Sequence, residues 1–254
     1  MAYKHGIYTS EVATSLVPMT ATSGGLIVAF GTAPVHLASE AVAVNTPVLC
    51  YSYKEAVAAL GYSDDWEKYT LSEVIKTQFA LFNVAPIVLV NVLDPKKHKK
   101  DVQDKQTAIV GGTAVVTEPA LLKTLGVKLS AAHQKLAPDK DYTAAYDAEG
   151  RLIITPIAGG GIPSGTTELC LSYTVLDPGA VKPADIIGGI DTVTNHTEGL
   201  ELIDEVFPRF GLVPGIIIAP GWSHDVGVSA VMKAKAMNIS GLFRCICLTD
   251  VDTG

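Results

Sequence analysis

The most enzyme-like string in the sequence is PGWSHD at residues 220–225, where Ser223, His224 and Asp225 are consecutive. It follows the apolar run GIIIA at 215–219, which predicts a buried strand, and open α/β sheets bind ligands at the carboxyl ends of such strands. Consecutive residues at the start of a helix point in different directions, so they cannot form a proton relay. The G-x-S-x-G elbow is also absent. Ser223 is explained instead as the N-cap of a helix from His224 to about Asn238, with Asp225 in its first turn.

Three pairs of residues have types that could bind a metal ion. They are Asp250 with Asp252, His196 with Glu198, and Cys245 with Cys247. The two aspartates fit a polar loop after a strand, and Glu198 fits the start of a helix. The cysteines share one face of a predicted strand, but no second Cys or His pair lies at ligand spacing. We therefore predict reduced thiols, no catalytic residue, no metal site and no cofactor.

Two further stretches could bind anions. Lys96–Lys100 holds four lysines and a histidine, yet acids flank the run and no aromatic residues interleave it, which favours a solvated linker. The loop Gly159–Gly165 lies between predicted strands and contains Pro163. A phosphate-binding loop needs a following helix, so this stretch predicts a hairpin loop.

Composition narrows the classes of protein to which the chain could belong. The chain has 254 residues, 48% hydrophobic and 18% charged, with a net charge of −7. This is enough chain for one large domain or two modest ones, and the low charge leaves room for buried interfaces. The negative balance predicts no general attraction to nucleic acid or anionic membrane. No apolar stretch approaches the ~20 residues of a transmembrane helix. MAYKHG opens into a polar leader without an apolar h-region, so we expect the protein to be made and kept in the cytoplasm unless lysis releases it.

The leader and the first strand differ in character. Leu26–Phe30 is a short, wholly apolar run between glycines, typical of a strand buried on both faces. The leader at residues 1–22 has no helical period and contains Pro18, but it carries many β-branched residues. We predict an extended arm that lies against its own body or a neighbour.

The stretches that follow alternate between helix and strand. We expect an edge strand near 47–51, a helix capped by Ser52 and Glu55, a second helix opened by a capping box of Thr70 and Glu73, and a buried strand at 86–93. After residue 184 we expect a helix at 198–210, then strands at 215–219 and 242–248 around the helix at 224–238. The fold class predicted is α/β, an open, mostly parallel sheet with flanking helices.

An all-β domain interrupts this pattern. Between the two halves the sequence has no helical period, and we expect strands at 127–129, 142–146, 152–156 and 168–176. The predicted division is an arm at 1–22, a discontinuous α/β body at 23–98 and 185–254, and an inserted sandwich- or barrel-like β domain at 99–184. Because no helix follows the last strand to cover it, we expect a longer natural protein or a trimmed chain.

The assembled pattern resembles the tail sheath proteins of contractile-tailed phages. Four stretches carry the resemblance in family order: HGIYTSEV with GGLIVAFGTAP, DYT with YDAEGRLIITPI and LSYTVLDP, GLELIDEVFPRFGLVPGIIIAPGWS, and FRCICLTD. The family continues beyond the last of these with a segment that completes the body and supplies a second arm, and this chain ends before it.

The resemblance implies a structural protein and no enzyme. Sheath proteins form hexameric rings that stack around the tail tube, and a baseplate trigger contracts them so that the tube crosses the host envelope. The implied partners are therefore other copies of the chain, the tail tube and the baseplate, without nucleic acid or membrane. The implied location is the virion tail, with assembly in the host cytoplasm. The implied interface is the arm, and its residues are Ile7, Tyr8, Thr9, Ser10, Glu11 and Val12. Two alternatives stay open: a ligand-binding or enzymatic α/β protein with an accessory β domain, and another structural protein of a phage tail or secretion device.

Overall fold

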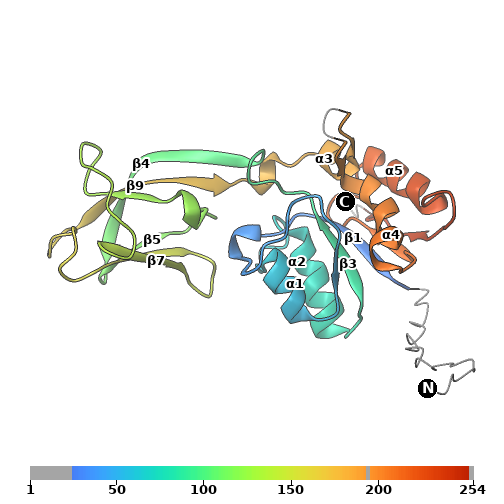
Figure 1. Ribbon diagram of the computed structural model, residues 1–254, viewed down its shortest axis with the longest axis horizontal. Coiled ribbons are helices and arrows are strands. Elements are labelled where there is room, and N and C mark those ends of the chain that lie inside the picture. The colour runs from blue at the N-terminus through green and yellow to red at the C-terminus, as the bar shows by residue number, and fades with distance from the viewer. Residues whose placement is uncertain (1–24, 193–194, 252–254) are drawn as a thin grey trace, which may run out of the picture.

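The computed structural model describes residues 25–192 and 195–251. The predicted arm, with Ile7–Val12, lies outside the described residues. Two sheets lie end to end along the long axis of the molecule (Figure 1). We call the α/β part around the first sheet the body and the part from β4 to β9, residues 99–176, the module.

The body sheet is mixed. Its strands are β1 (Ile27–Gly31), β2 (Val48–Cys50), β3 (Ile87–Asn91), β12 (Ile216–Ile218) and β13 (Ile246–Cys247), in the order β13-β12-β1-β3-β2. Strand β1 lies parallel to both β3 and β12, β12 lies parallel to β13, and β2 pairs antiparallel with β3. The expected α/β content is present. The sheet is mixed, because β1, β3, β12 and β13 run parallel to one another whereas β2 runs antiparallel to β3.

Helical segments cover both faces of this sheet (Figure 1). The first half supplies η1 (Val35–Leu37), α1 (Tyr53–Leu60), α2 (Thr70–Val74) and its π-helical continuation η2 (Ile75–Leu81). The second half supplies η4 (Pro178–Ala180), α3 (Pro183–Ile187), η5 (Gly199–Glu205), α4 (Val206–Phe210) and α5 (Val226–Met237), with a small hairpin of β10 (Gly189–Ile190) and β11 (Thr197–Glu198).

Two of these segments differ from the expected helices. The region 198–210 begins as the 3-10 helix η5 and becomes α-helical at Val206. Pro208 fits there because the first turn of a helix needs no main-chain donor from it. The expected strand at 242–248 shortens to Ile246–Cys247, since residues 239–243 form a turn closed by the Ile239 and Phe243 main chains.

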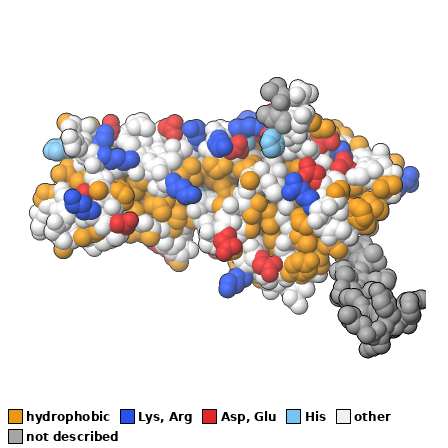
Figure 2. Space-filling model, viewed as in Figure 1, with side chains coloured by type: hydrophobic (Ala, Val, Ile, Leu, Met, Phe, Trp, Pro, Cys, Tyr) orange, Lys and Arg blue, Asp and Glu red, His pale blue; other side chains and the backbone are white. Residues whose placement is uncertain are grey.

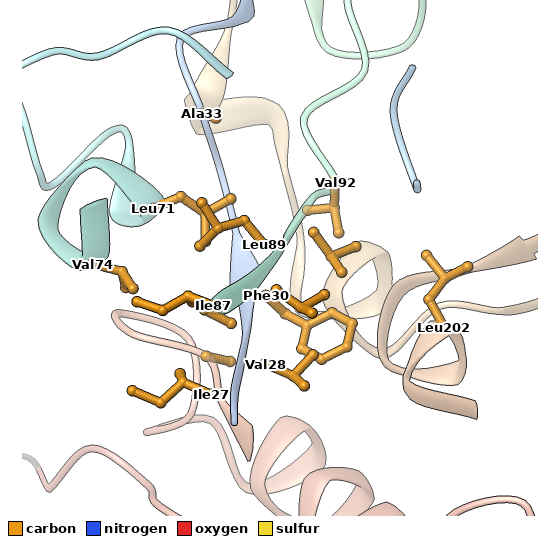
Figure 3. Close-up of a cluster of buried hydrophobic side chains, with 14 of the residues drawn as sticks. Ile27, Val28, Phe30, Ala33, Leu71, Val74, Ile87, Leu89, Val92 and Leu202 are labelled. Carbon is orange, nitrogen blue, oxygen red and sulfur yellow. The ribbon is translucent and has the colours of Figure 1, made fainter. Parts of the chain in front are cut away.

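The apolar run of β1 forms the centre of the body core. All five of its residues are buried. Figure 3 shows Val28 and Phe30 on the side of Leu202, while Ile27 lies on the opposite side with Leu71 and Val74. Successive side chains of a strand point to opposite faces, so a strand covered by helices on both sides needs apolar residues at every position.

The module is a six-stranded antiparallel sheet with the order β6-β9-β4-β5-β8-β7. Its strands are β4 (Lys99–Val110), β5 (Thr113–Val116), β6 (Gly126–Lys128), β7 (Tyr142–Tyr146), β8 (Leu152–Pro156) and β9 (Glu168–Leu176), and η3 (Leu122–Thr124) lies between β5 and β6. Strand β4 pairs with β9 along most of its length and with β5 at its end, so the sheet curls around a separate apolar cluster. Strands β7, β8 and β9 match the prediction, and β6 lies one residue from it.

Strand β4 corrects the prediction for residues 94–105. That stretch was interpreted as a solvated linker, but from Lys99 onward it is a twelve-residue strand. Its side chains are mostly exposed because β4 and β9 form a two-stranded ribbon between body and module, and charged residues are tolerated there. A bulge between Val102 and Lys105 also breaks the alternation on which the sequence interpretation depended.

One buried amide joins the ends of two central strands of the body. Asn91 is 2% exposed. Its Oδ1 accepts the N–H groups of Ala33 (2.9 Å) and Leu93 (3.1 Å), and its Nδ2 donates to the Leu93 carbonyl (3.1 Å). Asn91 therefore satisfies main-chain groups that the chain leaves unpaired where β1 and β3 end.

We expect Asn91→Ala to lower the free energy of unfolding by about 2–4 kcal/mol, because it leaves two buried N–H groups without an acceptor. Urea titration followed by circular dichroism measures the change. Gln106→Ala removes an exposed amide on β4 and serves as the control, with an expected change below about 0.5 kcal/mol. A loss for Asn91→Ala no larger than that of the control would contradict the role assigned to this amide.

Candidate functional site

The carboxyl edge of the body sheet is where an α/β protein of this kind would bind a ligand. Four polar residues follow the strands there: Thr32 after β1, Asn91 at the end of β3, Ser223 after β12 and Asp250 after β13. Thr32, Asn91 and Ser223 are buried. The chemistry available at this edge depends on which of their polar atoms are already engaged.

Thr32 and Thr70 bind each other. The Thr70 N–H donates to the Thr32 hydroxyl (3.1 Å), and the Thr32 N–H donates to the Thr70 hydroxyl (3.3 Å). The Thr32 carbonyl also accepts the Leu71 N–H (3.0 Å). The predicted capping box of Thr70 and Glu73 is therefore wrong. Tyr69 is the N-cap without a side-chain bond, and Thr32, 38 residues earlier, serves the start of α2. Half of the predicted box of Ser52 and Glu55 is present: the Ser52 hydroxyl accepts the Glu55 N–H (3.3 Å), but the Glu55 carboxylate accepts the Tyr51 N–H instead of that of Ser52.

Ser223 and Asp250 close the turn after β12. The Ser223 hydroxyl accepts the Asp250 N–H (2.8 Å), and the Asp250 carboxylate accepts the Gly221 N–H (2.8 Å). Ser223 is thus not the N-cap that the sequence predicted. Asp225 caps α5 by accepting from Gly227 and Val228. With Ser223 buried, His224 exposed and Asp225 engaged at the helix, the three residues form no relay.

The residue pairs that were weighed as metal ligands do not form metal sites in the described part of the chain. Asp250 is bound to Gly221, and Asp252 lies outside the described residues. Glu198 pairs with Lys97 (3.3 Å), and His196 lies beyond the hairpin turn on the exposed surface. Among residues 25–192 and 195–251, no three His, Cys, Asp or Glu side chains gather as a metal site.

The glycine-rich loop encloses a carboxylate of the chain itself. Asp141 accepts the N–H groups of Gly161 (2.8 Å) and Ala137 (2.7 Å), which hold the pKa of its carboxyl below the usual range. A Cβ at Gly160 would lie 2.8 Å from the Asp141 Cα. The glycines therefore allow the loop to pack closely on Asp141. The predicted hairpin loop is wrong, because the loop connects β8 to β9 and these two strands are separated by β4 and β5 in the sheet.

The lysine run divides between two structures. Lys97 binds Glu198, and Lys99 and Lys100 begin β4. His98 is buried between them: its Nδ1 accepts the Asp94 N–H (2.9 Å) and its Nε2 lies 3.4 Å from the Asp185 carboxylate. On the face shown in Figure 2, basic and acidic side chains are interspersed and form no single-sign patch.

An open surface that sequence reasoning missed lies along β13 and α5. A groove of about 530 Å³ runs between them, lined by Val226, Lys233, Met237, Cys245 and Cys247 among others. All four cysteines of the chain are free, and burial raises the pKa of Cys245 to about 11. The exposed side chains of Val226 (81%) and Met237 (59%) give this surface its apolar character. The run LFRCICL predicted the strand, but no sequence signal showed that its outer side stays open.

Strand β13 also offers main-chain groups. Ile246 and Leu248 donate their N–H groups to Gly215 and Ile217 of the β12 segment. Because the main-chain groups of a strand alternate, those of Cys247 point to the other side. Within the described part of the chain, no strand pairs with that side.

No helix in the described ranges is long and apolar enough to span a membrane. No protein-family model matches the chain.

A curated relative matches almost the whole chain. It is a tail sheath protein of Burkholderia phage BcepMu, 28% identical over 242 residues, which is 94% of this chain and 48% of the relative. The chain therefore spans about half the length of that relative. The match runs through both the body and the module, and it confirms the resemblance drawn from the four sequence stretches. Over most of its length, this chain is therefore similar to a phage tail sheath protein.

Proposed function

We propose that the chain is a structural subunit of a contractile tail sheath of a bacteriophage or prophage. Copies form hexameric rings stacked around the tail tube, and contraction on a baseplate signal drives the tube through the host envelope for genome ejection. Assembly takes place in the host cytoplasm and the product resides in the virion tail. The match to a tail sheath protein over 94% of the chain is the observation that carries this proposal.

The carboxyl edge of the body sheet supports a structural role over an enzymatic one. The side chains of Thr32, Asn91 and Ser223 are all engaged with main-chain groups. Such groups rigidify the junctions between strands and helices, and rearranging them to hold a ligand would leave buried donors unpaired.

The arm has a chemically suitable acceptor on a neighbouring copy. Ile7–Val12 is rich in residues that favour extended structure, and β13 presents the Cys247 main-chain groups beside an apolar groove. An extended segment added to an open sheet edge gains main-chain hydrogen bonds, and alternate side chains fill the groove. A contact from one copy to the edge of the next is heterologous, and such contacts repeat into helical assemblies.

The division of the chain into parts suits this assembly. We assign residues 1–22 to the arm, 23–98 and 185–254 to the body, and 99–184 to the inserted β domain. Two separate apolar clusters, one in the body and one in the module, support independent packing of these parts. Arms that stay attached while bodies rotate allow two packings of the same subunits, which contraction requires.

Negative-stain microscopy of the protein expressed from its complete gene tests the proposal. We expect sheath-like tubes or helical polymers from the wild type. Deleting residues 1–22 should leave the circular dichroism spectrum and melting temperature of the body unchanged while abolishing the polymers. A stable monomer that binds nucleotide would overturn the sheath assignment, and unchanged polymers after the deletion would overturn the role of the arm alone.

Paired proline substitutions separate main-chain from side-chain contributions of the arm. The N–H groups of residues 9 and 11 of an extended segment point to one side, and those of 8, 10 and 12 to the other. Thr9→Pro with Glu11→Pro removes the donors of one side, and Tyr8→Pro with Ser10→Pro removes donors of the other. We expect at least one pair to lower polymer yield about 10-fold or more in a sedimentation assay. The matched alanine pairs keep every N–H group, and equal losses from alanine and proline pairs would contradict strand addition.

A further inference from the structure

Body and module touch at a second place besides the ribbon of β4 and β9. His36 in η1 lies beside the Tyr69 ring of the body (centroids 6.1 Å apart) and the Tyr146 ring of the module (5.7 Å, planes at 76°). Next to it, Leu37 lies against Gly150 in the turn between β7 and β8, where a Cβ would be 3.0 Å from the Leu37 Cδ1. We call this contact the joint.

The module side of the joint is fixed. The Tyr146 hydroxyl donates to the Ala120 carbonyl (2.7 Å) and accepts the Leu122 N–H (2.9 Å). The ring therefore cannot turn aside without breaking bonds inside the module. If the His36 side chain becomes charged, either its own ring must move or the body and the module must move apart.

His36 packs in the joint as a neutral side chain. Its Nδ1 and the neighbouring Tyr69 hydroxyl are both buried and find no hydrogen-bond partner among the described residues. Burial lowers the pKa of His36 from 6.5 to about 4. The pKa values of Tyr69 and Tyr146 are raised by burial, so both rings stay neutral at and below pH 7.

Among the described residues, His36 forms no hydrogen bond or ion pair with a charged side chain, and burial alone lowers its pKa. The charged groups on the adjacent segments are Glu40, Asp64, Asp65, Glu67 and Lys68 on the body side and Lys123, Asp147, Glu149 and Arg151 on the module side. Asp65 pairs with Lys68 (2.5 Å), and Arg151 pairs with both Asp147 (2.6 Å) and Glu149 (3.0 Å). A proton on the buried Nδ1 would place a positive charge there without a partner, which is disfavoured, so protonation of His36 favours exposure of the ring.

We propose that His36 makes the joint acid-sensitive: the neutral ring packs between the two tyrosines, whereas the protonated ring leaves them and the module separates from the body. The ribbon of β4 and β9 stays intact and holds the separated module. The joint thereby becomes a hinge whose open state is favoured by protons.

The direction follows from proton linkage. The separated state takes up a proton below about pH 6.5, and the packed state resists it until about pH 4. The ratio of packed to separated molecules is therefore constant above pH 7 and falls by up to about 300-fold as the pH drops to 3. The joint is tightest at neutral pH and weakens between pH 6.5 and 4.

His98, which is buried at the root of the ribbon, is the second histidine between body and module, so the test must separate the two. Its Nδ1 accepts the Asp94 N–H, and its Nε2 faces Asp185. His98→Asn keeps an acceptor near the Nδ1 position and cannot be protonated. His224 is exposed on the start of the α5 segment, and His224→Gln is the control for a histidine away from both contacts.

The experiment follows the whole chain from pH 7 to pH 3 by small-angle X-ray scattering and far-ultraviolet circular dichroism. We expect the radius of gyration of the wild type to rise between pH 6.5 and 4 while the dichroism stays unchanged. His36→Phe keeps a ring without a titratable group and should abolish the rise. His36→Lys carries a charge at pH 7 and should be expanded there with a native dichroism spectrum. His98→Asn and His224→Gln should behave as the wild type.

Three outcomes would overturn the proposal. The rise persists in His36→Phe, or His36→Lys has the wild-type radius at pH 7, or the wild-type rise coincides with loss of dichroism, which would mean general unfolding. An NMR titration of the His36 ring adds an independent criterion, since a pKa near 6.5 with the joint packed would also refute it.

Discussion

The body sheet depends on hydrogen-bonding every main-chain group that is buried where its strands end. A parallel sheet covered on both faces places the carboxyl ends of several strands in one dry region, and water cannot serve them there. In this chain the side chains of Thr32, Asn91 and Ser223 accept such main-chain N–H groups. Each of these residues lies at or just after the end of a strand. These hydrogen bonds fix the start of α2, the junction between the ends of β1 and β3, and the turn after β12.

The same constraint explains why the edge that binds ligands in many α/β proteins serves architecture here. A side chain that accepts main-chain N–H groups is no longer available to a substrate, as with Asn91 and its two donors. Unpaired main-chain groups lie instead at the lateral edge of the sheet, where the outer side of β13 adjoins the apolar surface of α5. That combination suits contact with another polypeptide more than catalysis.

Much of the fold could be predicted because short apolar runs specify buried strands. LIVAF, PIVLV and GIIIA each have one reasonable interpretation, and β7, β8 and β9 are marked by alternation and turn residues. Strand β4 could not be predicted, because charged residues in a ribbon carry no burial pattern and a bulge interrupts the period. The roles of Thr70 and Ser223 also escaped prediction, since their partners Thr32 and Asp250 lie 38 and 27 residues away. Local capping rules assume a hydrogen-bond partner within four residues. In both cases the side chain binds a residue distant in the sequence instead.

The chain leaves and re-enters the body through neighbouring residues. The Asp177 N–H donates to the His98 carbonyl (2.9 Å), so the two ends of the module are already joined as they would be in a hairpin. Apart from the contact of His36 and Leu37 with the module, the segment between these residues acts on the body as a long loop, whose closure entropy grows slowly with its length. The module can therefore change in size or be replaced during evolution without altering the strand register of the body sheet.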